Sequence, residues 1–428
     1  MMNMFRNRWW IVFAAVCGLI VGTGAINIFA FGVFLKPVTE SLGIGRADLG
    51  RALVLNSSLT ALSCPIFGIL ITRFGVRQVM LPGVALFALA TAGYSFLQSS
   101  PIAIVYLIFG ISGFIGAAQT PVGYATVIAK WFDLKRGLAL GIAMAGVGLG
   151  VALVPQLAGA LIANFGWRMA YVGMGIAIVI LAFIPVAIFM REPSREDAVR
   201  NAAIPLDRIK RGFTTSEALL KSWRFWALTL AFFLGVVAIN GTLTQIVALL
   251  TDRGIPVQVA TGALSAAGIA IILGRIFSGW CIDRFWGPYV AICFFLIPMA
   301  GIGLLATGVG GMVPLAGAVL CGMGIGAEVD LMAFFVSRYF GLRSYSAVYG
   351  TMFAIFSVGT GFGPYLAGVS FDRWHSYQPI FAAFEIALAV TCILFIGLGP
   401  YPFPPEEGAE GANSGFGVFP RASSTTEP

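Results

Sequence analysis

Apolar residues run along this chain in stretches of about 20, each long enough to cross the hydrocarbon core of a bilayer as a helix. Short segments with glycine, proline and charged residues separate the stretches. Twelve can be delimited, at 9–36, 48–72, 78–98, 101–129, 136–163, 167–190, 223–250, 257–282, 288–308, 312–337, 344–371 and 376–399. The pattern predicts an all-α membrane protein with twelve transmembrane helices.

A charged stretch at 191–222 interrupts this pattern between the sixth and the seventh run. It predicts a cytoplasmic linker that divides the chain into an N-terminal six-helix half, 1–190, and a C-terminal six-helix half, 223–399. The tail at 400–428 is rich in Gly, Pro, Ser and Glu and has too few apolar residues to bury, so we expect it to be disordered.

Composition agrees with a polytopic membrane protein, because 59% of the residues are hydrophobic and only 10% are charged, against about 25% charged in soluble domains. The six cysteines lie in apolar stretches without a CxxC or Cys/His cluster, which indicates neither a disulfide framework nor a metal site. The glycine-rich runs lack the Gly-Lys-Ser/Thr ending of a phosphate loop. We therefore expect no metal and no cofactor.

Positive charge is distributed unevenly between the predicted loops. If both termini are cytoplasmic, 19 of the 26 Lys and Arg residues fall on the cytoplasmic side, as the positive-inside rule requires. The net charge of +8 then reflects topology and attraction to anionic lipids and not binding to nucleic acid. The expected location is a cell membrane, as in a bacterial inner membrane, with both termini in the cytoplasm.

The two halves repeat each other in sequence. Four short matches keep nearly constant offsets of 208 to 213 residues: Ala25–Asn27 with Ala238–Asn240, Thr72–Gly75 with Asp283–Trp286, Lys130–Leu134 with Arg338–Leu342, and Pro155–Gly159 with Pro364–Gly368. Two similar halves with a site between them near the midplane are typical of alternating-access transporters.

Several motifs carry a family resemblance: Gly68–Arg77, Gly279–Phe285, Gly32–Pro37, Lys130–Gly150 with Phe165–Arg168, and Glu328-Val-Asp330 ahead of Ser337–Phe340. On these residues the chain resembles the major facilitator superfamily, and within it the bacterial members of the monocarboxylate transporter and oxalate/formate antiporter branch. The resemblance covers all twelve spans. It implies the major facilitator fold, two pseudo-symmetric six-helix halves around one substrate site.

Arg275 lies deep in the apolar run 257–282 and stands four residues before Gly279, the position of the family's substrate-binding arginine. An arginine cannot lose its charge, and a cation near the bilayer centre costs roughly 3 kcal/mol or more if it is unpaired. Its planar fork suits a carboxylate. Arg275 is thus the predicted anchor of a small organic acid, unless it only closes an ion pair between helices.

The chain departs from the family at two coupling positions, which are Ile271 and Phe29 where animal members have Asp and Lys. The antiporter branch has a second cation in helix 11, yet 346–370 contains no Lys or Arg. One fixed cation favours a monoanionic substrate over a dianion such as oxalate.

Glu328 and Asp330 are the best candidates for a proton-coupling acid. Asp330 lies eight residues before Arg338 and Arg275 lies eight before Asp283, which places both side chains at a similar depth, about 12 Å from the cytoplasmic boundary. Residues two apart on a helix point about 200° apart, so only one of the two acids can face the cavity. A permanent ion pair with a structural role is the alternative.

Other polar or aromatic residues could complete the site. The predicted substrate contacts are Tyr124, Asn27, Asn240, Gln245 and Phe335, although an amide in a membrane is as often a bond between helices. The residues that resemble the family's gating motifs are Arg73, Arg77, Arg136, Asp283 and Arg284, for which topology and lipid contact offer the alternative explanation.

These features predict a monomeric secondary transporter of small monocarboxylates such as lactate or pyruvate, driven by protons and working by alternating access. Exchange of one organic anion for another is the first alternative, and a substrate-sensing receptor on the same scaffold is the second. An enzyme is not expected, because neither His-Glu-x-x-His nor Gly-x-Ser-x-Gly occurs and the single histidine lies in a loop.

Overall fold

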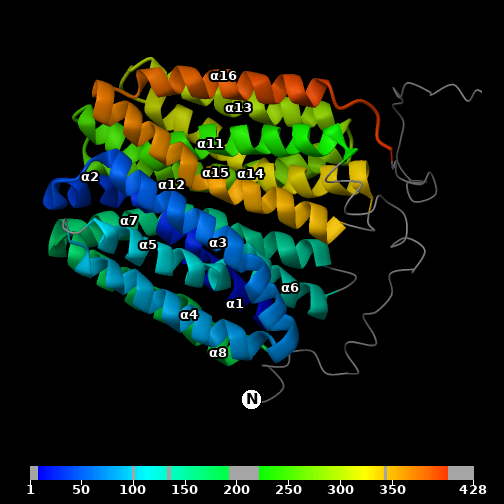
Figure 1. Ribbon diagram of the computed structural model, residues 1–428, viewed down its shortest axis with the longest axis horizontal. Helices are drawn as coiled ribbons and strands as arrows, with labels where there is room; N and C mark the ends of the chain where they lie inside the picture. The colour runs from blue at the N-terminus through cyan, green and yellow to red at the C-terminus, as the bar shows by residue number, and fades with distance from the viewer. Residues whose placement is uncertain (1–7, 99–101, 133–135, 192–220, 342–344, 403–428) are drawn as a thin grey trace, which may run out of the picture.

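The structure is a computed structural model that describes residues 8–98, 102–132, 136–191, 221–341 and 345–402. Within these residues the chain is helical apart from short connections (Figure 1). Eleven helical stretches are long and apolar enough to span a membrane, and one of them, Ala139–Phe189, contains two spans because the chain turns at Gly166. The predicted all-α fold with twelve spans is confirmed.

The first half contains spans 1 to 6. Its elements are α1 (Trp9–Ile20), η2 (Gly24–Phe29), α2 (Phe31–Leu42), α3 (Arg46–Phe74), α4 (Val76–Gly93), η3 (Tyr94–Phe96), α5 (Ala103–Gly116), η4 (Ala117–Gln119), α6 (Pro121–Trp131), α7 (Arg136–Ile178), η5 (Val179–Phe183) and α8 (Ile184–Phe189). The second half is more regular, with one helix for each span: α11 (Trp223–Asp252), α12 (Val257–Ile282), α13 (Gly287–Ala306), α14 (Val313–Phe340), α15 (Tyr345–Trp374) and α16 (Gln378–Ile396).

Three spans of the first half differ from the uniform helices that the apolar runs predict. Span 1 contains the π-helical turn η2 and continues as α2 to Leu42, six residues beyond the predicted end. Span 4 is interrupted by η4, and Pro121 then starts α6. Spans 5 and 6 are joined at Gly166, whose φ of 75° is the left-handed conformation that glycine adopts without strain. These local changes in helix geometry do not alter the pattern of apolar residues, so that pattern could not predict them.

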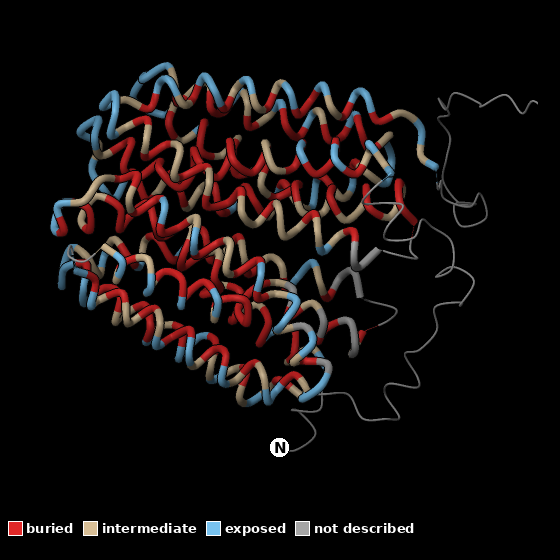
Figure 2. The backbone as a smooth tube through the Cα atoms, viewed as in Figure 1, coloured by how far each residue is buried: buried red, intermediate tan, exposed pale blue. Residues whose placement is uncertain are grey.

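The two halves lie side by side, with the helices α11 to α16 forming one layer of Figure 1 and α1 to α8 the other. Exposed residues are frequent along the outward edges of the bundle (Figure 2). Large apolar side chains are among the exposed ones, for example Leu89 of α4 and Ile393 of α16. These edges suit the hydrocarbon core of a bilayer, whereas the surfaces between helices are buried. The chain is therefore a multi-pass membrane protein.

We call the end with the loops 43–45, 253–256 and 375–377 the far end and the opposite end, with residues 190 and 222, the linker end. Contacts between the halves are found towards the far end. The Thr360 hydroxyl donates to Ser57 at 3.3 Å, joining α15 to α3, and Gln156 of α7 bonds to Thr261 and Ser265 of α12. These hydrogen bonds join the halves towards the far end.

Glycine allows helices to pack closely where α12 lies against α14. A Cβ on Gly274 would lie 2.4 Å from the Met323 carbonyl oxygen, and a Cβ on Gly326 would lie 2.2 Å from that of Ile271. Since lipid tails are as apolar as leucine side chains, such close backbone packing stabilises a helix pair in a membrane where the hydrophobic effect cannot.

We predict that Gly274→Ala destabilises the protein by about 1 to 3 kcal/mol, because the new methyl group would meet backbone that cannot move aside. Gly279→Ala on the same helix is the matched control, since nothing lies within 4 Å of its Cβ position; it is expected to be neutral or to stabilise by up to about 1 kcal/mol. Thermal unfolding of the detergent-solubilised protein measures both. Equal effects of the two substitutions would contradict this account of the packing.

Candidate substrate site

Arg275 of α12 and Asp330 of α14 form an ion pair inside the membrane-spanning part of the second half. The Arg275 Nε lies 3.1 Å from Asp330 Oδ2, and the same nitrogen donates to the Gly326 carbonyl oxygen at 3.4 Å. The Arg275 side chain is 16% exposed and that of Asp330 is 39% exposed. The pair is therefore only partly buried, and Asp330 is its more exposed member.

The pairing follows from the spacing of residues on α14. Gly322, Gly326 and Asp330 are four residues apart and share one face of the helix. The two glycines bring this face against α12 at Ala267 and Ile271, and the next position in the row is Asp330. A side chain larger than hydrogen at Gly326 would push α14 away from α12 and separate the acid from Arg275.

Arg275 also shares a face with the surface that α12 presents to the first half. Gly268 packs against Ala152 of α7, where a Cβ would lie 2.5 Å from the Ala152 nitrogen. Seven residues make two turns of helix, so Arg275 lies on the same face two turns closer to the linker end. Arg275 therefore lies on the face of α12 that is turned towards the first half, beyond the far-end contact.

The guanidinium of Arg275 keeps donors free for a ligand. Its contacts to Asp330 and Gly326 are made through Nε, and neither terminal nitrogen makes a hydrogen bond to another described residue. Two parallel terminal N–H groups are the geometry that binds a carboxylate in a fork. The arrangement can therefore accept a carboxylate without first losing the contacts that hold the arginine in place.

Glu328 points to the other side of α14. It is 1% exposed, and a Cβ on Gly235 of α11 would lie 3.1 Å from its Oε1. Neither carboxyl oxygen has a hydrogen-bond partner among the described residues. The two acids are thus separated as their spacing requires, with Asp330 beside Arg275 and Glu328 inside the second half.

Tyr124 lies in the interior of the first half and is fully buried. Its hydroxyl donates to Gln119 Oε1 at 2.7 Å and packs against Gly18, where a Cβ would lie 2.0 Å from the hydroxyl oxygen. The Gln119 Nε2, also buried, has no partner among the described residues. Gln119 is thus a polar group beside the predicted tyrosine with one unused donor.

The repeat mates Asn27 and Asn240 have different surroundings. Asn27 belongs to the π-turn and donates to Ser112 at 3.2 Å and to Asn56 at 3.5 Å, inside the first half. Asn240 lies in the regular helix α11 and is 4% exposed. Its side chain makes no hydrogen bond to another described residue. Of these two repeat-related asparagines, Asn240 is therefore the one whose side-chain amide is free to contact a ligand.

Two other predicted contacts lie away from Arg275. Gln245 donates to the Pro364 carbonyl oxygen at 3.2 Å and accepts from the Tyr377 hydroxyl at 3.4 Å, near the far end. Phe335 is fully buried in an aromatic cluster with Phe232 and Phe395. The structure places Phe335 in the core of the second half, so we do not include it in the site.

The residues of the predicted gating motifs lie at the linker end. Arg77 donates to the Ala187 carbonyl oxygen at 2.9 Å, and the Arg284 guanidinium stacks over the Trp280 ring. Arg73 and Asp283 are exposed. The side chain of Arg136 is outside the described part of the chain. The contacts of Arg77 and Arg284 each stay within one half, so a latch between the halves remains a prediction.

Comparison with known proteins places these observations in a family. Residues 14–355 match the sequence profile of the Major Facilitator Superfamily. The oxalate:formate antiporter of Oxalobacter formigenes is 29% identical over 291 residues, 67% of this chain and 64% of that protein, slightly less than two thirds of its length. Monocarboxylate transporter 3 of Rattus norvegicus is 25% identical over 421 residues, 95% of this chain and 84% of that protein.

A solved structure supports the same fold. It is that of a bacterial homologue of the human lysosomal transporter Spinster in an inward-facing and unoccupied conformation, with a TM-score of 0.65 and 18% identity. The likeness covers 92% of this chain and 96% of that one. With the profile match over most of the sequence and the twelve-span fold, the chain belongs to the Major Facilitator Superfamily and is a secondary transporter, not an enzyme.

Proposed function

We propose that this protein carries small monocarboxylate anions, of the size of lactate or pyruvate, together with protons across a cell membrane. The observation that carries the proposal is the Arg275–Asp330 pair, a fixed cation inside the membrane whose terminal donors are free and whose only acidic partner among the described residues is partly exposed. Both termini are cytoplasmic in this proposal, and the membrane is a bacterial inner membrane. The protein acts as a monomer.

Charge balance explains why a proton would travel with the anion. In the empty site the charges of Arg275 and Asp330 cancel. When a carboxylate binds Arg275, the site gains one negative charge, which is costly to move through a low-dielectric interior. Protonation of Asp330 restores neutrality while the terminal nitrogens of Arg275 hold the substrate. The occupied and empty forms then have equal charge, and both can reorient.

The substrate class follows from the number of cations. Arg275 is the fixed cation of the described membrane interior, and the stretch 346–370 of span 11 contains no Lys or Arg. One cation matches one carboxylate. The similarity to monocarboxylate transporter 3 supports this class. The similarity to the oxalate:formate antiporter favours the second candidate, exchange of one organic anion for another without net proton movement.

We predict that Arg275→Lys lowers uptake of labelled L-lactate by proteoliposomes under an inward proton gradient by roughly tenfold or more, because an ammonium group cannot form two parallel bonds to a carboxylate. Arg373→Lys is the matched control, an exposed far-end residue, and should transport as the unmodified chain does. Full uptake by Arg275→Lys would show that Arg275 has only a structural role and does not bind the substrate. If the unmodified protein does not take up lactate, the test extends to other monocarboxylates under exchange conditions.

A second prediction separates symport from exchange. Asp330→Asn should abolish stimulation of uptake by the proton gradient, because an amide cannot take up and release the proton, while exchange of internal for external substrate continues. Uptake with and without substrate inside the liposomes measures both modes. Should Glu328→Gln lose the stimulation instead, the coupling acid is Glu328. Gradient-independent exchange by the unmodified protein would favour the anion exchanger.

A further inference from the structure

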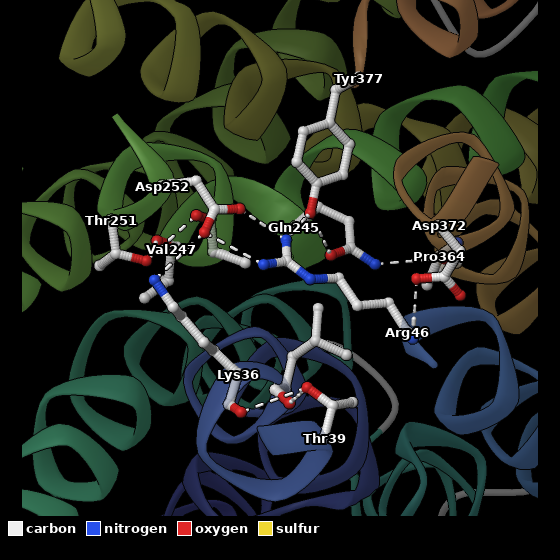
Figure 3. A network of polar contacts seen from close by, with 12 residues as sticks. Lys36, Thr39, Arg46, Gln245, Val247, Thr251, Asp252, Pro364, Asp372 and Tyr377 are labelled. Carbon is white, nitrogen blue, oxygen red and sulfur yellow. Dashed lines mark hydrogen bonds and ion pairs between the residues drawn. The ribbon is translucent and has the colours of Figure 1, made fainter. Parts of the chain in front are cut away.

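The far end holds charges of opposite sign from opposite halves (Figure 3). Lys36 and Arg46 come from the first half, and Asp252 and Asp372 come from the second. Tyr377 lies next to them in the loop before α16. We call these five residues the far-end lock. Among these five residues the two cations come from the first half and the two carboxylates from the second, so their charges cancel only when the halves are together.

Arg46 and Asp252 form the centre of the lock. Arg46 donates from Nη1 to Asp252 Oδ2 at 2.6 Å and from Nη2 to Oδ1 at 3.0 Å, a forked pair between α3 and the end of α11. Lys36 contacts the same carboxylate at 3.2 Å. The Arg46 side chain is 9% exposed, so water screens this pair less than it screens a surface ion pair.

Asp372 of α15 caps a helix of the other half. It accepts hydrogen bonds from the backbone nitrogens of Arg46 at 3.1 Å and Ala47 at 2.7 Å, the first two residues of α3. A carboxylate there satisfies N–H groups that have no partner within the helix and interacts favourably with the helix dipole. Gly368 makes the approach possible, since its Cβ would lie 2.8 Å from the Arg46 carbonyl carbon.

Tyr377 extends the lock towards the middle of the bundle. Its hydroxyl accepts a hydrogen bond from Arg46 Nη1 and donates to Gln245 Oε1 on α11. Burial raises the pKa of Tyr377 above its ordinary value, so the hydroxyl keeps its proton and remains a donor at neutral pH. The Arg46 guanidinium also lies 3.5 Å from the centre of the Phe371 ring. Each of these side-chain contacts joins Arg46 to the second half.

We propose that the far-end lock is the gate that closes this side of the transporter, and that Gln245 connects the gate to the helix that carries Asn240. Opening requires the Arg46–Asp252 fork, the Asp372 cap and the Tyr377 bridge to break together, since all of them join the same two surfaces. The inference needs only a transporter with two moving halves. It does not depend on which solute is carried or on proton coupling.

The test is amide hydrogen exchange of the purified, substrate-free protein with Asp252→Asn, which leaves Lys36 and Arg46 without their carboxylate. We expect exchange in 43–56 and 361–377 to increase by about tenfold or more, because removing one member of a desolvated pair is costly. At the linker end, exchange in 276–288 should slow, since opening of one end of an alternating-access transporter closes the other.

Glu40→Gln is the control, because it removes an exposed carboxylate at the same end that is not part of the lock; its exchange should equal that of the unmodified chain. Tyr377→Phe keeps the ring and removes only the bridging hydroxyl, so it should produce a smaller change in the same direction. Unchanged far-end exchange in Asp252→Asn would overturn the proposal. Faster exchange at both ends would overturn it too, by showing that the pair supports folding and not gating.

Discussion

Close approach of helix backbones through glycine is the constraint on which the rest of this structure depends. In a bilayer the hydrophobic effect does not drive one helix onto another, so packing must come from backbone surfaces that fit without side chains between them. Gly274 and Gly326 join α12 to α14, and Gly268 joins α12 to α7. One helix therefore packs closely against its own half and against the other, and Arg275 lies on it.

The charged groups use this packing in two ways. Arg275 and Asp330 meet within one half, so movement of the halves leaves their distance unchanged while it changes access to them. Arg46 and Asp252 meet across the halves, so the same movement must separate them. The first pair is suited to bind and the second to hold a conformation. Position relative to the boundary between the halves, and not the chemistry of the residues, makes the difference.

The sequence predicts the fold because twelve apolar runs leave little freedom in a bilayer. It also brings Arg275 and Asp330 to one depth, since helical rise converts residue number into distance. Which face a residue occupies is harder to predict. Phe335 is one of the predicted substrate contacts, yet it packs on Phe232 of another helix in the core of the second half, and spacing along one helix does not show which helix lies opposite. The sequence alone shows Lys36 and Asp252 only as two charged residues near predicted loops. That they have opposite signs and belong to opposite halves is the one sequence signal that could have indicated the lock.

The π-turn at Gly24–Phe29 bears on the symmetry of the molecule. The offset between the repeats falls from 213 residues at Ala25 and Ala238 to 211 at Thr72 and Asp283, so the first copy has two more residues between these points. A π-turn takes up one extra residue and rotates the remainder of the helix by about 100°. The duplicated helices have therefore diverged in winding. A solute moving from one side to the other would meet two unlike surfaces, and the outward and inward forms of the site need not have equal affinity.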